Sequence, residues 1–320
     1  MPLEVSNIGF EQVEKVAAAG WLYAILDATD EPAVPEKVRQ LDERRAASLF
    51  RGTAQEPYWA CAPYLVQTDS AMLAWIFDSL LQRPWGVFVV SQAELDVLRF
   101  HLQQFVSVEL PNGRPAHFRF YDPRVLAVYL PTCNQHELRA FFGPVRAYLV
   151  PSADKVTLLK NIDSGAPNGA AGPLPIRPEQ FAVLGRLSLA DFIRRMTPHL
   201  HRLFADRCRA IGDPGISKAV EIGVASAAKY GIVDEPDVCR YIELMFVFGV
   251  HFDSDTRFPW AANLLNNHSI VSSHQKLAAV VAAANEAGQY RKPDAAIVRV
   301  SENTPGLAQV AAGQGLVGAT

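Results

Sequence analysis

The sequence predicts an α/β (α+β) N-terminal lobe, in which helices flank a mixed sheet, followed by an all-α C-terminal lobe. Helix and strand patterns alternate through the first half of the chain, whereas the second half shows helical patterns alone. Between them, residues 163–175 hold three glycines and three prolines, a composition typical of a linker. We therefore predict an α/β domain over 1–150, a linker over 151–178, a helical lobe over 179–290 and an extended or flexible tail over 291–320.

Strands are predicted where β-branched and apolar residues run together. The clearest run is Gly86-Val87-Phe88-Val89-Val90, and residues 21–27, 63–68 and 146–150 show similar patterns. Two more runs, 106–110 and 117–121, flank Asn112-Gly113. Because an Asn-Gly pair adopts the backbone angles of a tight turn, these two runs predict a hairpin.

Helix starts are indicated by polar residues whose side chains can accept a hydrogen bond from a free backbone N–H group. In the first lobe, four helices are predicted to begin at such residues: Ser6, Ser91, Asp122 and Asn134. Ser91 and Asn134 are each followed three positions later by a glutamate, which is the pattern of a capping box. Pro123 directly follows Asp122 and suits the first position of a helix.

In the second lobe, helices are predicted to begin at Ser188, at Asp213-Pro214, at Pro236 and at Gln275. The helix that begins at Pro236 is apolar nearly all round from residue 241 to residue 250. A helix with that pattern is expected at the centre of its bundle.

Composition limits the classes of partner. The chain has 320 residues with 30 basic and 33 acidic side chains, and its formal net charge is −3. No block of like charge stands out, so we expect no binding to nucleic acid or to an anionic membrane. The start of the chain has no basic region before an apolar run, and no apolar run reaches membrane-spanning length, so the expected compartment is the cytoplasm.

The four cysteines, Cys61, Cys133, Cys208 and Cys239, are far apart and form no CxxC pair. Each lies among apolar neighbours. The pattern favours buried free thiols in a reducing compartment.

Metal and cofactor motifs are weak. Residues 313–318 read GxGxxG, but only two residues follow, so no helix can offer its N-terminus to a dinucleotide. His251, Asp253 and Asp255 alternate and could bind a metal, but no fourth ligand is visible and capping aspartates in a loop explain them better. His199 and His201 stand two positions apart, which on a helix points them to different faces. We expect no cofactor and no metal.

Catalytic candidates are also few, since the chain has no GxSxG elbow and no Walker-type loop. The enzyme alternative is a small-molecule hydrolase or transferase that uses Asp27, Ser91 or His101. It requires those side chains to converge in one pocket. Capping and turn roles for Asp27 and Ser91 are the preferred interpretation.

The string Phe118-Arg119-Phe120-Tyr121-Asp122-Pro123-Arg124 is the most unusual in the chain. Arg119 and Arg124 could clamp an anion. The favoured alternative places Phe118 and Phe120 in the core, with Asp122 as a helix cap and the two arginines as braces.

Seven short strings follow one another through the first lobe, at residues 22–28, 48–53, 62–66, 85–91, 101–102, 118–124 and 142–144. In this order and spacing they resemble the adaptors, or effector chaperones, of bacterial type VI secretion. The resemblance covers about residues 21–150 and is weaker in the second lobe, at residues 230–232 and 248–253.

The resemblance implies function by binding, with no catalytic residue to carry over. Such proteins recognise an N-terminal segment of a toxic effector and deliver it to the spike protein VgrG. The resemblance therefore implies a non-enzymatic adaptor whose partners are a cognate effector and VgrG. Asp27, Arg119, Asp122, Pro123 and Arg124 are then family residues with structural roles.

A binding groove is expected in one lobe or between the lobes, and capture of a helix in a groove suits the helical lobe best. Because aromatic side chains are common at the centres of interfaces, the predicted protein-binding residues are Trp59, Phe258, Trp260 and Tyr290. A third interpretation is a structural baseplate-associated protein, which would assemble stably without cargo.

Overall fold

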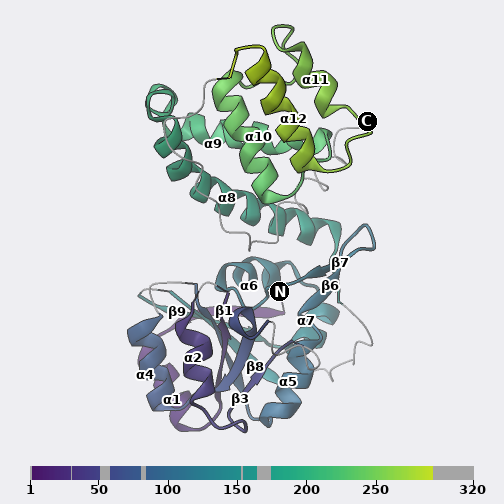
Figure 1. Ribbon diagram of the computed structural model, residues 1–320. Coiled ribbons are helices and arrows are strands. Elements are labelled where there is room, and N and C mark those ends of the chain that lie inside the picture. The colour runs from purple at the N-terminus through teal and green to yellow at the C-terminus, as the bar shows by residue number, and fades with distance from the viewer. Residues whose placement is uncertain are drawn as a thin grey trace. The chain divides into compact units, whose positions relative to one another are not determined.

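The computed structural model describes residues 2–29, 31–50, 58–80, 84–152, 154–163 and 174–290. The chain forms two compact units, residues 1–184 and 185–320, and the division falls within helix α8 (Pro178–Leu203). The described part of the first unit holds sheets flanked by helices, and that of the second is helical (Figure 1). The predicted fold class is therefore confirmed.

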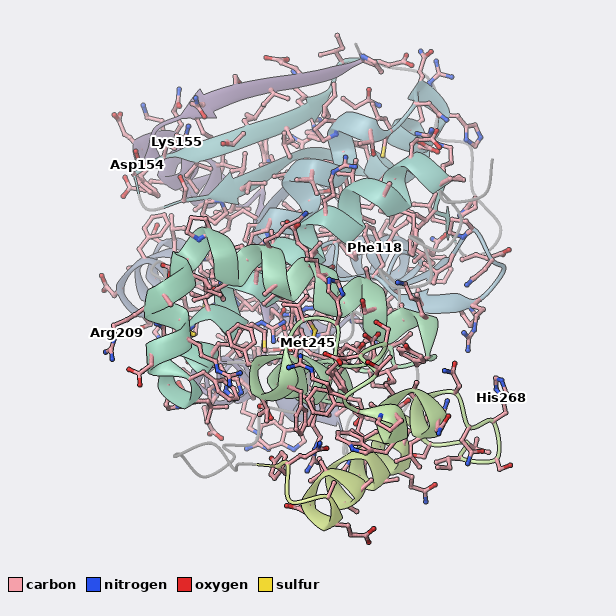
Figure 2. The ribbon with its side chains drawn as sticks, turned by 90° about the horizontal axis from the view of Figure 1, so that it is seen from above. Phe118, Asp154, Lys155, Arg209, Met245 and His268 are labelled. Carbon is pink, nitrogen blue, oxygen red and sulfur yellow. The ribbon has the colours of Figure 1, made fainter. Side chains whose placement is uncertain are left out.

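A seven-stranded sheet organises the first unit, with the strand order β1-β9-β8-β5-β2-β4-β3. Its strands are β1 (Leu3–Ile8), β2 (Leu22–Asp27), β3 (Ala46–Ser48), β4 (Pro63–Gln67), β5 (Gly86–Ser91), β8 (Val145–Pro151) and β9 (Val156–Asn161). Each neighbouring pair runs antiparallel. β1 and β3 are the two edge strands, and Asp154 and Lys155 lie in the turn between β8 and β9 (Figure 2).

A second, three-stranded sheet has the order β10-β6-β7, with β6 (Ser107–Glu109), β7 (Pro115–His117) and β10 (Leu174–Pro175). β10 pairs with β6 in parallel, and β6 pairs with β7 in the antiparallel hairpin that Asn112-Gly113 predicted. The second strand of the hairpin ends at His117, so the prediction of a strand over 117–121 is wrong beyond that residue.

Helices cover both faces of the large sheet. Along β2, Tyr23 and Ile25 belong to one core, and Leu22, Ala24 and Leu26 belong to the other, as the two-residue period of a strand requires. The first core includes α5 (Leu95–Gln103), α6 (Pro123–Tyr129) and α7 (Gln135–Phe142), and the second includes α1 (Phe10–Ala18), α2 (Ala33–Arg39) and α4 (Ser70–Ser79).

Two of the predicted helix caps are confirmed. The Asp122 carboxylate accepts a hydrogen bond from the N–H of Arg124 at 2.8 Å, with Pro123 at the first position of α6. Asn134 accepts from the N–H of Glu137 at 2.9 Å, and Glu137 accepts from the N–H of Asn134 at 2.8 Å, which is a complete capping box.

The other two caps are wrong. Ser6 lies in β1, and α1 begins at Phe10 after Gly9. Ser91 is the last residue of β5, and its hydroxyl donates to the carbonyl of Pro144 at 2.9 Å, while α5 begins only at Leu95. In both cases strand pairing with a distant segment holds the residue extended.

The predicted linker, 151–178, contains β9, which pairs with β1 and β8 and belongs to the large sheet. The sheet therefore extends beyond the boundary predicted at residue 150. The Gly- and Pro-rich stretch 164–173 lies outside the described residues, as does the predicted tail 291–320.

The second unit consists of the rest of α8 with α9 (Ala205–Lys229), α10 (Glu235–Phe248), α11 (Pro259–Leu265) and α12 (Ser273–Glu286). α8 begins ten residues before Ser188, so that predicted start is wrong. Gly212 interrupts α9 with φ 66° and ψ 171°, directly before the predicted start at Asp213-Pro214.

α10 is the most deeply buried helix described in the second unit, as its apolar sequence predicts. Tyr241, Ile242 and Met245 are at most 2 % exposed. Figure 2 shows Met245 among the side chains of this unit, with Arg209 and His268 at its outside. Within the described ranges, no helix combines the length and the apolar character needed to cross a bilayer.

Candidate functional site

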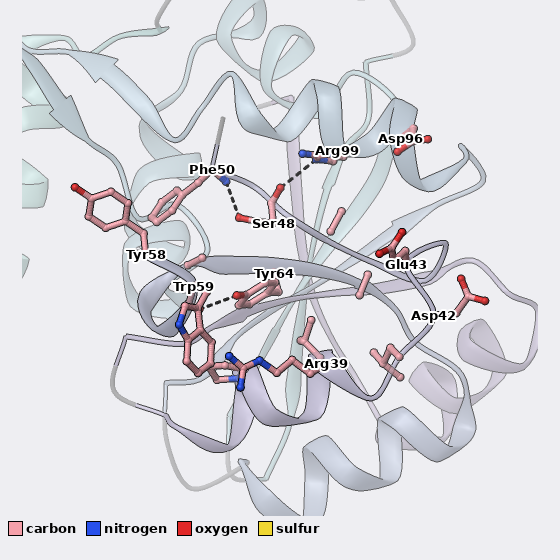
Figure 3. Close-up of a pocket in the computed structure, with 16 residues that line it drawn as sticks. Arg39, Asp42, Glu43, Ser48, Phe50, Tyr58, Trp59, Tyr64, Asp96 and Arg99 are labelled. Carbon is pink, nitrogen blue, oxygen red and sulfur yellow. Dashed lines mark hydrogen bonds between the residues drawn. The ribbon is translucent and has the colours of Figure 1, made fainter. Parts of the chain in front are cut away.

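A groove of about 640 Å³ lies beside the edge strand β3 in the first unit (Figure 3). Its lining comes from α2, from the loop that leads into β3, from β3 itself, from residues 58–64 and from α5. α2 packs on one face of the large sheet and α5 on the other, so the groove follows the sheet edge between them. A volume of this size falls in the range of ligand-binding clefts.

The direction of the backbone groups of β3 follows from its pairing with β4. The carbonyl of Arg45 accepts from the N–H of Gln67 at 2.8 Å, and the N–H of Leu49 donates to the carbonyl of Pro63 at 2.9 Å. In an antiparallel pair, alternate residues point both groups at the partner strand. The intervening residues, Ala46 and Ser48, therefore point their N–H and C=O groups away from β4.

The outward carbonyl of Ser48 is already used. It accepts hydrogen bonds from Nε of Arg99 at 3.1 Å and from Nε2 of Gln103 at 3.3 Å, both on α5. At Ala46, by contrast, no described hydrogen bond engages the outward groups. α5 therefore covers the outer side of β3 at Ser48, whereas Ala46 can form backbone hydrogen bonds with another extended segment.

One end of the groove is aromatic. The guanidinium of Arg39 lies 3.6 Å from the centre of the Trp59 ring, and the Trp59 carbonyl accepts from the hydroxyl of Tyr64 at 2.7 Å. The guanidinium covers one face of the half-buried indole, and the bond from Tyr64 holds the Trp59 backbone. Tyr58, which is 54 % exposed, and Phe50 lie at the same end (Figure 3).

The other end of the groove is acidic. Asp42 and Glu43 precede β3, Asp96 lies in the first turn of α5, and all three are exposed (Figure 3). Asp42 accepts from the N–H of Arg44 at 2.8 Å, which closes the turn before β3. In the described part of the chain, no ion pair joins any of these three carboxylates to a basic side chain.

The residues of the Phe118–Arg124 string brace the fold. Phe118 and Phe120 lie in the core, and Arg119 donates to Asp27, which also accepts from the N–H of Thr29 at 3.0 Å. Burial acts to lower the pKa of Arg119, but the charge of Asp27, the hydrogen bond to Asp27 and the charges of Tyr121 and Asp122 together raise it above its ordinary value. Arg124 binds Asp122, with 2.7 Å between Nη2 and Oδ2.

The enzyme alternative needs Asp27, Ser91 and His101 together. Asp27 binds Arg119, Ser91 donates to the Pro144 carbonyl, and Nε2 of His101 lies 3.0 Å from the Phe141 carbonyl. Among the described hydrogen bonds, none joins two of these three side chains.

The metal candidates of the 251–255 loop have separate partners. The Asp253 carboxylate accepts from the hydroxyls of Tyr230 at 3.0 Å and Tyr241 at 2.8 Å. Asp255 pairs with Arg257 at 2.6 Å, and His251 is exposed. His201 binds Asp213 at 2.8 Å and does not share a ligand with His199.

A cluster that the sequence did not reveal lies between α8 and α10. The ligand-type atoms of His199, Cys239 and Glu243 lie within 4.8 Å of one another. Cys239 and Glu243 stand one helical turn apart on α10, but only the fold brings His199 to them. The i, i+4 spacing on α10 is the sole sequence signal.

Hydrogen bonding accounts for this cluster without a metal. Nη2 of Arg202 lies 3.1 Å from Nδ1 of His199, and a guanidinium can only donate, so Nδ1 accepts. Nε2 then carries the proton and donates to Glu243 at 2.7 Å. Burial raises the pKa of the Cys239 thiol, which disfavours a thiolate ligand.

The predicted protein-binding residues fall into two places. Trp59 lines the groove of the first unit. Phe258, Trp260 and Tyr290 gather around Phe248 in the second unit, with ring centres 5.1, 5.4 and 6.2 Å from it. All three are half-buried and pack against the core.

The cysteines are free thiols, with Cys133, Cys208 and Cys239 buried and Cys61 half-buried. The GxGxxG string at 313–318 lies outside the described residues.

Comparison with known proteins gives one finding. No curated protein and no solved structure gives a significant match to the chain. A family model does match, and its range runs from the start of β2 into α7, so it includes every residue that lines the groove. Residues 22–140 are thus similar to the family described as "Domain of unknown function (DUF4123)".

Proposed function

We propose that the protein is a type VI secretion adaptor that binds a cognate toxic effector and helps to load it onto the VgrG spike. Two sequence observations support this proposal: the ordered strings across residues 21–150 resemble such adaptors, and residues 22–140 match the DUF4123 family model. The structural observation that carries it is the groove beside β3, which lies inside the matched range.

The groove has the features of a polypeptide-binding site. A half-buried tryptophan held under an arginine is the kind of rigid aromatic anchor that dominates many interfaces once a partner covers it. Outward backbone groups at Ala46 offer hydrogen bonds to an extended chain. In the proposed function, the groove holds an effector segment in the cytoplasm until the effector reaches the spike.

This proposal places the cargo in the first unit, whereas capture of a helix in a groove was expected to suit the helical lobe best. A hollow in the second unit, beside Glu243 and Tyr290, measures about 10 Å³, which suits one water molecule. Of these two hollows, the groove of the first unit is the one large enough to hold a polypeptide segment.

Co-purification tests the proposal. Cells would express the tagged chain with the toxin encoded beside it and with the spike protein, and the purified chain should retain the toxin. If neither toxin nor spike protein accompanies the chain, the proposed function is wrong.

A matched pair of variants then asks whether the groove is the cargo site. Trp59→Ala should reduce toxin recovery at least about fivefold, the scale of an interface hot spot. Trp21→Ala is the control, because Trp21 is 41 % exposed in the same unit, has Arg146 at 5.8 Å from its ring and does not line the groove.

A further inference from the structure

We infer that the groove beside β3 selects an extended segment that carries an aromatic or large aliphatic side chain at one end and basic side chains at the other. This inference rests on the proposed function and specifies the chemistry of the cargo. It combines the polarity of the groove, its charge and the direction of the β3 backbone.

The polarity is plain in Figure 3, where Tyr58, Trp59 and Phe50 lie at one end and Asp42, Glu43 and Asp96 at the other. The aromatic end offers faces and edges to an apolar side chain and is half-shielded from water. The acidic end offers only hydrogen-bond acceptors when its carboxylates are ionised. A segment that matches both ends must itself be polarised.

The charges of the lining favour a basic partner. Three carboxylates face two arginines in the groove, and both arginines have other contacts. Arg39 stacks on Trp59 and lies 3.3 Å from Glu36, while Nε of Arg99 donates to the Ser48 carbonyl. Lysine or arginine side chains of a bound segment could therefore pair with the carboxylates at the acidic end. The same carboxylates would repel an acidic segment.

The backbone of β3 indicates that the segment is extended. Ala46 lies between the acidic end, which precedes β3, and the aromatic end, which follows it, and its outward N–H and C=O groups can form a two-bond pair with one residue of the segment. Arg99 and Gln103 hold the Ser48 carbonyl, so pairing stops there. An extended segment advances about 3.3 Å per residue, so an apolar side chain at one end of the groove and basic side chains at the other come from positions several residues apart.

Titration calorimetry with defined peptides tests this inference. The probe is a heptapeptide in which one phenylalanine is followed by four serine or threonine residues and two lysines, and its partner peptide has glutamates in place of the lysines. The wild-type chain should bind the lysine peptide about tenfold more tightly, with the difference shrinking as salt is added.

Variants at the acidic end should change this preference. The double variant Glu43→Gln/Asp96→Asn should bind the lysine peptide about fivefold more weakly than the wild type. Glu43→Lys should reduce or reverse the preference for the lysine peptide over the glutamate peptide. The control is Glu4→Gln/Glu14→Gln, which removes two exposed carboxylates from β1 and α1 and should leave binding unchanged. Equal losses in both double variants would point to general electrostatics and overturn the inference.

Ala46→Pro tests the backbone contact separately. Proline removes the outward N–H but no bond to β4, so thermal unfolding should change little while peptide binding weakens. Unchanged binding by a folded Ala46→Pro variant would show that the segment does not pair with β3.

The failure of this inference can be told from the failure of the proposed function. If the full-length toxin still co-purifies with the Glu43→Lys and Ala46→Pro variants as it does with the wild type, the adaptor stands and the groove inference is wrong. If light scattering shows that the same substitutions dissociate a dimer of this chain, the occupant is a second copy, which also overturns the inference.

Discussion

The carboxylate of Asp27, at the end of β2, accepts a hydrogen bond from the guanidinium of Arg119, 92 positions further along the chain. The Asp27 side chain is 4 % exposed and that of Arg119 is 21 % exposed. The pair ties the central region of the large sheet to the segment that joins the β6–β7 hairpin to α6. A buried carboxylate depends on its partner, because an unpaired charge inside a protein is costly.

Arg119→Gln should therefore destabilise the first unit by about 3 kcal/mol, the lower end of the range for one half of a buried pair. Asp27→Asn/Arg119→Gln should recover part of this loss, since neither charge then remains unpaired. Urea unfolding followed by tryptophan fluorescence measures both. If the losses of unfolding free energy caused by Asp27→Asn and by Arg119→Gln simply add in the double variant, the two side chains are not paired. Arg146→Gln, at an exposed site, is the control, and its free energy of unfolding should lie within about 0.5 kcal/mol of wild type.

Stability of the first unit should depend on the protonation of His101. Burial lowers the pKa of this imidazole below its ordinary value of 6.5, although its bond to the Phe141 carbonyl acts in the opposite direction. The unfolded chain then binds a proton near pH 6.5 while the folded chain does not. The contribution of His101 is thus complete above about pH 6.5 and is lost as pH falls toward the folded pKa.

His101→Gln should flatten the dependence of unfolding free energy on pH below about pH 6.5, because glutamine can donate to the same carbonyl but does not titrate. Urea unfolding at a series of pH values gives the slope. His136→Gln is the control, since His136 is exposed in the same unit. Identical slopes for wild type and His101→Gln would show that His101 is not coupled to folding.

Gly86 should tolerate no side chain. Its φ is +148°, and a Cβ atom there would lie 1.9 Å from the Ile25 carbonyl oxygen of the neighbouring strand β2. Gly86→Ala must therefore separate β2 from β5 in the core of the sheet, and we expect a loss of more than about 3 kcal/mol or no folded protein. Gly20→Ala is the matched control, with φ +75° but open space around the new Cβ, and should cost about 1–2 kcal/mol. Similar thermal unfolding of the two variants would contradict this account.

Glu137 joins α7 to the start of α8. Besides its capping bond, its carboxylate accepts from Nε of Arg177 at 2.7 Å and from Nε2 of Gln180 at 3.1 Å, and it is 8 % exposed. Glu137→Ala should cost about 2 kcal/mol, from the lost cap and the lost bonds to α8. Glu137→Gln can still cap α7 and should cost less than half as much in urea unfolding. If the two variants are equally unstable, the cap is not the source of the stability.

The sequence predicted correctly those helix caps whose hydrogen bonds join residues close together in the chain. Asp122 and Asn134 bond to backbone groups two and three positions away, so the sequence contains the whole interaction. Ser91 has the same local pattern, and its hydroxyl accepts from the N–H of Ala93 at 3.1 Å, but pairing with Val145 on β8 keeps Ser91 in β5, and α5 begins only at Leu95. No local pattern can show that competition.

The strands at the other end of the sheet were missed for the same reason. β1 and β9 pair Leu3 with Asn161, a contact between the two ends of the unit. Neither strand has the continuous buried run of β2, because exposed and half-buried residues interrupt both the edge strand β1 and its neighbour β9. The linker prediction therefore began within the sheet.

The candidate site was predicted only in part. Trp59 was expected as a binding residue from its type, and the structure places it in the groove. The acidic end and the outward groups of Ala46 depend on α2, β3 and α5 meeting at one sheet edge. That meeting is tertiary, as is the approach of His199 to Cys239, so sequence spacing could not show either.

Because β8 and β9 belong to the large sheet, a fragment that is to contain the whole sheet must include both strands. The family match stops at residue 140, before either strand, yet β8 pairs with β5 and β9 with both β8 and β1. A truncated protein limited to residues 22–140 would leave one side of β5 without its neighbour and bare the apolar surface beneath, so we expect it to aggregate on expression. The stretch that matches the family is therefore shorter than the stretch needed to complete the large sheet.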